Sequence, residues 1–396
     1  MTNWHIITCE YPPQIGGVSD YTRLLAQHLR AAGDPVQVWA PTIDAPKEQG
    51  LHRVMRQFDA KYLREIEGLF DAFPQPRTFL LQWVPHGYGK RGMNLGFVRW
   101  ITSRVSRGDR LCLMIHEPYL ERGQGSWKLR IMSLAQRRMM RLLLKSSSRV
   151  FVSIPGWESY LRPYLRANQS YEWLPIPATI FSEQDERAIS AVRNRLGAAL
   201  LLGHLGTYSA ESRRILEPAI IETLKQISEV HVVLMGKHSD HVAAELKSQN
   251  PELAARMHGL GLLPDSDLAS HISACDAMVQ PFIDGVSSRR TSIMNVISRG
   301  VPVVSNLGHL SEPIWAESQA VALAPSPDPI QIAAVCTRLL RNQQARQQFA
   351  ERGLKLYRSC FDWPNIIATL RSSPDEALPS NASTSSNQVP VAGKLK

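Results

Sequence analysis

A chain of 396 residues is too long for one ordinary core, and a composition with 44% hydrophobic and 20% charged residues excludes an intrinsically disordered protein. The net charge is +10, but no nucleic-acid recognition motif, leader peptide or apolar run of about 20 residues is present, so we expect a cytoplasmic protein without a nucleic-acid partner. Five scattered cysteines lack the CxxC or CxxH spacing of a zinc site or redox dithiol.

Short apolar runs alternate with longer segments of helical period along most of the chain. In the first half, the runs predict strands at 6–9, 36–40, 78–83, 111–115, 150–154 and 171–174. In the second half, they predict strands at 201–205, 230–235, 257–260, 277–280, 301–304 and 320–323. This alternation is typical of βα units around a parallel sheet. We therefore predict an α/β protein with two Rossmann-like domains that face each other across a cleft, where ligands bind beyond the carboxyl ends of the strands.

The first predicted strand leads into Glu10-Tyr-Pro-Pro-Gln-Ile-Gly-Gly-Val-Ser-Asp-Tyr21 and then a helix. Gly16 and Gly17 let the backbone approach a ligand, and the helix N-terminus behind them offers free N–H groups to an anion. The pattern predicts a phosphate-facing loop; a plain turn before a helix is the alternative.

The string YPPQIGGVSDYTRLLAQHLRAAG, followed by a strand, resembles the N-terminal signature of the retaining glycosyltransferases whose C-terminal half is called the "glycosyltransferases group 1" domain. The resemblance runs to about residue 371 and is strongest at 10–33 and 259–305. It implies the glycosyltransferase-B fold, with a nucleotide-diphosphate sugar as the donor substrate.

Two prolines after Leu174 favour an extended connection between the halves. We therefore place an N-terminal, acceptor-side domain at 1–177 and a C-terminal, nucleotide-sugar domain at 178–358. The resemblance implies that 359–371 contains a helix crossing back to the N-terminal domain. Residues 372–396 are polar and small, which predicts a disordered tail.

His116 follows the predicted strand at 111–115, where the related enzymes carry a histidine that faces the donor sugar. We predict a catalytic role for it, with Glu117 either orienting its ring or lying in solvent as a loop acid. Aromatic faces suit the apolar faces of sugars. The predicted acceptor side comprises Tyr11, Tyr21, Trp83 and Glu117; structural packing is the alternative for the aromatic residues.

Residues 51–150 hold 19 Lys/Arg against 7 Asp/Glu. Many of these cations lie at 127–145, where apolar residues recur at helical spacing, so we predict a basic amphipathic helix. Its polar face either is simply solvated or contacts anionic lipid or an acidic glycan. The second possibility would make the protein peripheral at the inner face of a membrane.

In the second half, Gly206 ends a predicted strand where the family has a turn against the diphosphate. Lys237 is a candidate donor-binding cation, although an ordinary surface lysine is equally consistent with the sequence. Asp265 and Asp267 resemble a short metal-binding motif, but they precede a helix and N-capping explains them. We predict no metal and no cofactor.

The ending Gly300-Val-Pro-Val-Val resembles the family's nucleotide-binding strand, and counting back places the family's two glutamates at Ser287 and Asn295. Asn295 can bond a ribose hydroxyl without offering charge. The remaining donor-binding candidates in this segment are Asp284, Gly285 and Ser288. Arg289 and Arg290 at a helix start predict a diphosphate clamp that takes over charge neutralisation; a surface cation pair with N-capping serines is the alternative.

These residues predict a glycosyltransferase that moves a sugar to a glycan or lipid-linked acceptor, with retention and without metal, in polysaccharide or cell-envelope glycoconjugate synthesis. Because the glutamate pair is missing, two alternatives stay open. One is a catalytically idle subunit that binds nucleotide or glycan, and the other is a sugar-nucleotide epimerase of the same fold.

Overall fold

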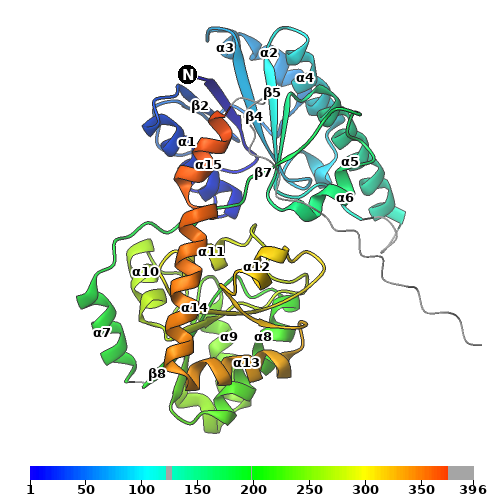
Figure 1. Ribbon diagram of the computed structural model, residues 1–396. Helices are drawn as coiled ribbons and strands as arrows, with labels where there is room; N and C mark the ends of the chain where they lie inside the picture. The colour runs from blue at the N-terminus through cyan, green and yellow to red at the C-terminus, as the bar shows by residue number, and fades with distance from the viewer. Residues whose placement is uncertain (122–126, 198, 373–396) are drawn as a thin grey trace, which may run out of the picture.

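The computed structural model describes residues 1–121, 127–197 and 199–372. Apart from its first residue, the predicted tail therefore lies outside the described residues. The chain forms a seven-stranded and a six-stranded sheet, each in its own domain, seen one above the other in Figure 1. All strand pairings in both sheets are parallel. The predicted α/β class with two Rossmann-like domains is confirmed.

The N-terminal sheet has the strand order β3-β2-β1-β4-β5-β6-β7. Its strands are β1 (Asn3–Ile7), β2 (Val36–Trp39), β3 (Leu51–His52), β4 (Arg77–Trp83), β5 (Arg110–Ile115), β6 (Arg149–Val152) and β7 (Glu172–Trp173). The helices of this domain are α1 (Gly17–Ala31), α2 (Ala60–Glu65), α3 (Glu67–Asp71), α4 (Leu95–Val105), α5 (Trp127–Ser146) and α6 (Glu158–Leu161). The central strand β4 is buried along its whole length, which explains its nearly continuous apolar run.

The C-terminal sheet has the order β10-β9-β8-β11-β12-β13. Its strands are β8 (Leu200–Leu205), β9 (Val230–Met235), β10 (Met257–Gly259), β11 (Ala277–Val279), β12 (Val303–Asn306) and β13 (Ala322–Ala324). The helices are α7 (Glu186–Leu196), α8 (Ala210–Gln226), α9 (Ser239–Gln249), α10 (Asp265–Ala274), α11 (Thr291–Ile297), α12 (Pro313–Glu317), α13 (Pro329–Arg341) and α14 (Gln343–Leu356). In both sheets, the first strand of the domain lies inside the sheet. Because all strands run parallel, the loops that follow their carboxyl ends lie along the same edge of each sheet.

The last described helix returns to the domain where the chain began. After α14, a single π-helical turn leads into α15 (Trp363–Arg371), which packs against α1 (Figure 1). Asp362 caps α15 by accepting from the backbone N–H of Asn365 at 3.2 Å. The buried Trp363 stacks on His28, with ring centroids 4.6 Å apart. Helix α15 thus completes a core of the N-terminal domain.

Arg149, at the start of β6, holds the end of α15. Its guanidinium donates to the carbonyl oxygens of Thr369 and Leu370 at 2.9 and 2.8 Å, and it is ion-paired with Glu172 at 2.5 Å. A cation at the last carbonyls of a helix satisfies acceptors that have no partner within the helix.

Among the described helices, none is long and apolar enough to cross a bilayer.

Candidate functional site

The loops at the carboxyl ends of the two sheets meet between the domains. Ser288, beyond β11, donates its hydroxyl to the carbonyl oxygen of Ser153, beyond β6, at 3.0 Å. Its hydroxyl oxygen accepts from the indole N–H of Trp173 at 3.1 Å, and its single hydrogen is shared between the Ser153 carbonyl and the carboxylate of Glu312. Leu310, in the loop after β12, is 8% exposed because it inserts into a core of the N-terminal domain. The predicted site residues therefore lie beside a packed junction between the domains.

Arg289 and Arg290 lie at this junction and share the carboxylate of Asp284. Arg289 also reaches the N-terminal domain, with its Nη1 atom 3.1 Å from a carboxylate oxygen of Glu117. Each guanidinium lies over an aromatic ring: Arg289 is 5.2 Å from the centre of Trp157 and Arg290 is 4.5 Å from that of Phe282. Aromatic and ionic contacts together position both cations.

Burial and charge act in opposite directions in this cluster. Burial raises the pKa of Asp284, but the guanidiniums of Arg290 and Arg289 outweigh it, so the pKa lies below its usual value. Burial and the neighbouring Arg289 lower the pKa of Arg290. Two partly buried cations thus lie side by side at the junction, where their guanidinium groups can hold an anion.

The serines before the arginine pair are both buried, with different surroundings. Ser288 donates its backbone N–H to the buried carboxylate of Glu312 at 2.9 Å, and its hydroxyl bonds to the same carboxylate. Glu312 also accepts from the indole of Trp315 at 2.8 Å, and burial raises its pKa. The hydroxyl of Ser287 has no hydrogen-bond partner among the described residues. Ser288 thus holds the junction together, whereas Ser287 keeps its hydrogen-bonding capacity.

Asn295, the position of the family's second glutamate, binds the connection between the domains. Its amide oxygen accepts from the backbone N–H groups of Thr179 and Ile180 at 2.7 and 3.1 Å. The amide nitrogen donates to the hydroxyl of Thr179 at 3.3 Å. In this structure, the side chain stabilises the interdomain linker, and its predicted contact with a ribose remains a prediction.

His116 is partly exposed and follows β5. Its Nε2 atom lies 2.8 Å from the amide oxygen of Gln82, which assigns a proton to Nε2 and leaves Nδ1 as the acceptor. Burial lowers the pKa of His116 to about 3, so the imidazole is neutral near pH 7. The ring is bonded to Gln82, whereas Glu117 reaches Arg289; Glu117 is therefore a junction residue in this structure.

The Gly16-Gly17 loop holds a carboxylate of the protein itself. Glu10 accepts from the backbone N–H groups of Val18 and Ser19, both at 3.0 Å, in the first turn of α1. A Cβ atom on Gly16 would lie only 2.2 Å from a carboxylate oxygen of Glu10. Because Gly16 has no side chain, the carboxylate of Glu10 can approach the N-terminus of α1 and bind it. This is the helix N-terminus that was predicted to face a phosphate.

The predicted aromatic residues of the acceptor side are buried. Tyr11 is 1% exposed, and Tyr21 and Trp83 are fully buried. Tyr11 donates its hydroxyl to Glu48 at 3.1 Å, and Trp83 donates its indole N–H to the carbonyl of Pro118 at 2.9 Å. These side chains pack inside the cores of the N-terminal domain.

The other predicted donor-binding residues lie at carboxyl edges of the C-terminal sheet. Gly206 follows β8, and Lys237 is exposed after β9. Gly285 has a φ of +89°, and a Cβ atom there would lie 2.3 Å from the backbone nitrogen of Gly308. Only glycine therefore allows the loops after β11 and β12 to pack this closely.

Within the described ranges, no three His, Cys, Asp or Glu side chains gather as metal ligands.

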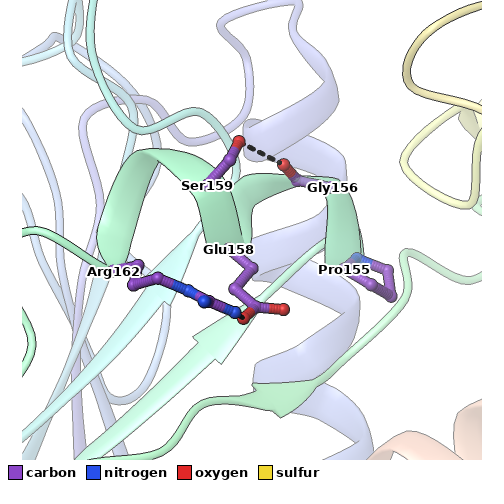
Figure 2. Close-up of a pocket in the computed structure, with 5 residues that line it drawn as sticks. All are labelled: Pro155, Gly156, Glu158, Ser159 and Arg162. Carbon is purple, nitrogen blue, oxygen red and sulfur yellow. Dashed lines mark hydrogen bonds and ion pairs between the residues drawn. The ribbon is translucent and has the colours of Figure 1, made fainter. Parts of the chain in front are cut away.

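A surface hollow with a volume of about 530 Å³ lies on the N-terminal side of the junction. Figure 2 shows its lining: Pro155 and Gly156 come from the turn after β6, and Glu158 of α6 and Arg162, directly after α6, point toward each other. Gly156 adjoins Leu310, since a Cβ atom there would lie 3.5 Å from that side chain. The hollow is large enough for a sugar ring and adjoins the arginine cluster through the Pro155–Trp157 turn.

Several residues of the junction were not predicted. Glu312 is a buried carboxylate before Pro313, and Leu310 is an apolar residue in a loop. Gln82 is the last residue but one of the buried strand β4, where a polar residue is unusual. Only Gln82 carries a visible sequence signal, because the other two residues acquire their roles through contacts with distant segments.

Two Rossmann-like domains whose strand ends face each other define a protein of the glycosyltransferase-B class. The solved structure of sucrose-phosphate synthase from Thermosynechococcus elongatus has a similar fold, with a TM-score of 0.69 and 15% sequence identity. The similarity covers 93% of this chain and 97% of that one. Anabaena HepE, in complex with UDP and glucose, has a TM-score of 0.65, 14% identity and coverage of 93% and 98%.

Sequence comparison identifies the family. Residues 199–342 match the model of the family described as Glycosyl transferases group 1. A phosphatidyl-myo-inositol mannosyltransferase of Mycobacterium leprae is 23% identical over 387 residues, which cover 91% of this chain and 93% of that protein. The C-terminal domain thus matches the group 1 glycosyltransferases, in agreement with the predicted family and enzyme class.

Proposed function

We propose that the protein transfers a glycosyl residue from a nucleoside-diphosphate sugar to a glycan or lipid-linked acceptor, with retention and without a metal ion. The observation that carries this proposal is the cluster of Arg289, Arg290 and Asp284 at the junction. The similar fold of Anabaena HepE, which was solved with UDP and glucose, supports the donor class. A lipid-linked acceptor is supported by the similarity to the mannosyltransferase of Mycobacterium leprae.

In the proposed reaction, the bond between the anomeric carbon and the diphosphate oxygen breaks while the acceptor hydroxyl attacks the same face. The hydroxyl proton passes to the departing diphosphate oxygen, so no carboxylate base is needed. Arg289 and Arg290 stabilise the negative charge that grows on the diphosphate. His116 is neutral, so it holds the sugar by hydrogen bonding and does not act as a charged acid. The hollow at Pro155–Arg162 is the proposed acceptor side.

Helix α5 supports a peripheral position at the inner face of a membrane. An exposed stripe runs along it at alternating spacings of four and three residues. The stripe consists of Trp127, Ile131, Leu134, Arg138, Arg141 and Lys145. Its first three members are apolar and 67, 49 and 56% exposed, and its last three are cations. Such a face suits a helix that lies in the interface of an anionic membrane.

The test of the proposed function is a donor screen. The purified protein is incubated with sugars linked to UDP, GDP, ADP, CDP and dTDP, and released nucleoside diphosphate is measured. We expect release from one donor class, with strong stimulation by an acceptor. Failure of every donor to bind or react would contradict the proposal.

Single substitutions in the cluster test the diphosphate clamp. We expect Arg289→Ala and Arg290→Ala each to weaken the affinity for the matching nucleoside diphosphate by about 10- to 100-fold, because each removes a charge-assisted hydrogen bond. Isothermal titration calorimetry measures the change. Arg338→Ala, in an exposed position of α13, is the matched control and leaves the affinity unchanged. Normal affinity in both cluster variants would exclude the clamp.

A further inference from the structure

Arg289 is held by carboxylates from both domains. One terminal nitrogen of its guanidinium is bonded to Asp284 of its own domain, and the other lies 3.1 Å from Glu117 of the N-terminal domain. The Nε atom is buried and has no hydrogen-bond partner among the described residues. Nη1 and Nη2 are therefore each bonded to a carboxylate, and an anion that approaches either nitrogen competes with that carboxylate.

The two carboxylates differ in how firmly they are held. The side chain of Asp284 is 16% exposed and bonds to Arg289 and Arg290 at once. The side chain of Glu117 is 46% exposed and makes a single ion pair, which crosses between the domains. An exposed single pair contributes little stability, whereas breaking a buried shared pair leaves uncompensated charge. Glu117 is thus the carboxylate that an incoming anion displaces from Arg289 more easily.

The charge balance of the cluster also indicates that a diphosphate would displace Glu117. Arg289 and Arg290 carry two positive charges, which Asp284 and Glu117 together neutralise. A diphosphate brings at least two negative charges to the same guanidiniums, so it competes with a carboxylate for Arg289. When Glu117 rotates into solvent, the cluster regains a net positive charge, which the diphosphate can neutralise.

We propose that Glu117 is a placeholder counterion: it holds Arg289 in position across the junction and gives it up to the diphosphate of the donor. This inference rests on the proposed function, because it assumes that Arg289 binds the donor. Glu117 is then a positioning residue that weakens donor affinity while keeping the cation oriented. The same exchange breaks one contact between the domains and so couples donor entry to their relative movement.

Replacing Glu117 by the neutral Gln tests the exchange with little change in shape. We expect Glu117→Gln to bind UDP, GDP or ADP, whichever the unaltered protein binds, with a Kd about two- to fivefold lower, the range for removal of one competing exposed ion pair. Calorimetric titration at constant salt measures it. Glu121→Gln is the matched control, because Glu121 lies in the same loop but bonds to Tyr160; its Kd stays unchanged.

A double-substitution cycle separates the exchange from a general change in charge. On an Arg289→Ala background, we expect Glu117→Gln to have no effect on the Kd, because the guanidinium for which Glu117 and the diphosphate compete is absent. An equal improvement on both backgrounds, or an unchanged or weaker affinity for Glu117→Gln alone, would overturn the inference while the donor class stands. If neither the unaltered protein nor Glu117→Gln binds any of the nucleotides, the proposed function fails together with it.

Discussion

Gly16 illustrates how one missing side chain shapes the start of α1. The carboxylate of Glu10 occupies the space where a Cβ atom would lie, and from there it bonds two backbone N–H groups of the helix. Capping of this kind replaces hydrogen bonds that the first turn cannot make internally. The geometry of the loop therefore depends on Gly16 more than on its neighbour Gly17, which has open space at its Cβ position.

We expect Gly16→Ala to lower the free energy of unfolding by about 1–2 kcal/mol, because the added methyl group displaces the capping carboxylate. Urea denaturation measures the change. Gly17→Ala is the control: nothing lies within 4 Å of its Cβ position, and alanine is the better helix former. Equal stability of the two variants would show that the cap contributes nothing.

His116 gives the molecule a pH dependence whose sign follows from burial. Its pKa falls from 6.5 to about 3 on folding, so between these values the unfolded chain binds a proton that the folded protein does not. Stability is therefore complete above pH 6.5 and decreases as the pH falls toward 3, by about 1.4 kcal/mol per pH unit.

We expect His116→Gln to reduce this loss by about 3 kcal/mol between pH 6.5 and 4. Urea denaturation at several pH values gives the difference between the two proteins. His5 and His204, whose pKa values burial also lowers to about 3, contribute equally to both proteins and cancel. Parallel pH profiles would contradict the assignment of a neutral ring with a lowered pKa.

The sequence predicted where the arginine pair lies but not what it contacts. A helix start after an apolar strand places Arg289 at the crevice edge, because the carboxyl ends of parallel strands share one edge of a sheet. Its partner Glu117 is 172 residues away, and this contact depends on how two domains pack. The same reason explains why buried positions of Tyr21 and Trp83 could not be distinguished from an aromatic ligand site.

Among the elements, α5 has the surface most unlike that of an ordinary soluble helix. We expect the protein to bind vesicles of anionic phospholipid and Ile131→Glu or Arg141→Glu to weaken binding severalfold, because each change opposes burial or attraction at the membrane surface. Vesicle flotation at increasing salt measures it, with the exposed Ile330→Glu and Lys225→Glu as matched controls. Absence of binding to anionic vesicles would remove the proposed membrane role.

Secondary structure could be predicted well where a segment is long or apolar. All twelve predicted strands are present, since each is an apolar run within a βα repeat. β3 was missed because Leu51–His52 is too short to show a period and becomes a strand only by pairing with β2. The basic helix at 127–145 is present as α5, within one residue at its C-terminal end.

At the scale of the whole molecule, α15 attaches the last described part of the chain to the N-terminal domain. We expect Trp363→Ala to lower the free energy of unfolding by about 3–5 kcal/mol, because it removes a buried ring that stacks on His28 and donates to the carbonyl of Ala178. Urea denaturation and the rate of proteolysis near α15 measure it. Trp127→Ala, at a 67% exposed position, is the matched control. Unchanged protease resistance in Trp363→Ala would show that α15 stays docked without its anchor.

The docking of α15 on α1 also sets the order in which the protein can mature during synthesis. Every residue of the second domain leaves the ribosome before Trp363 does, so the first domain waits with one apolar face uncovered while its neighbour is made. A nascent or truncated chain that stops short of α15 would expose Tyr21, Leu25 and Leu29 to chaperones and proteases. The core of the first domain is thus completed only after the second domain has been synthesised.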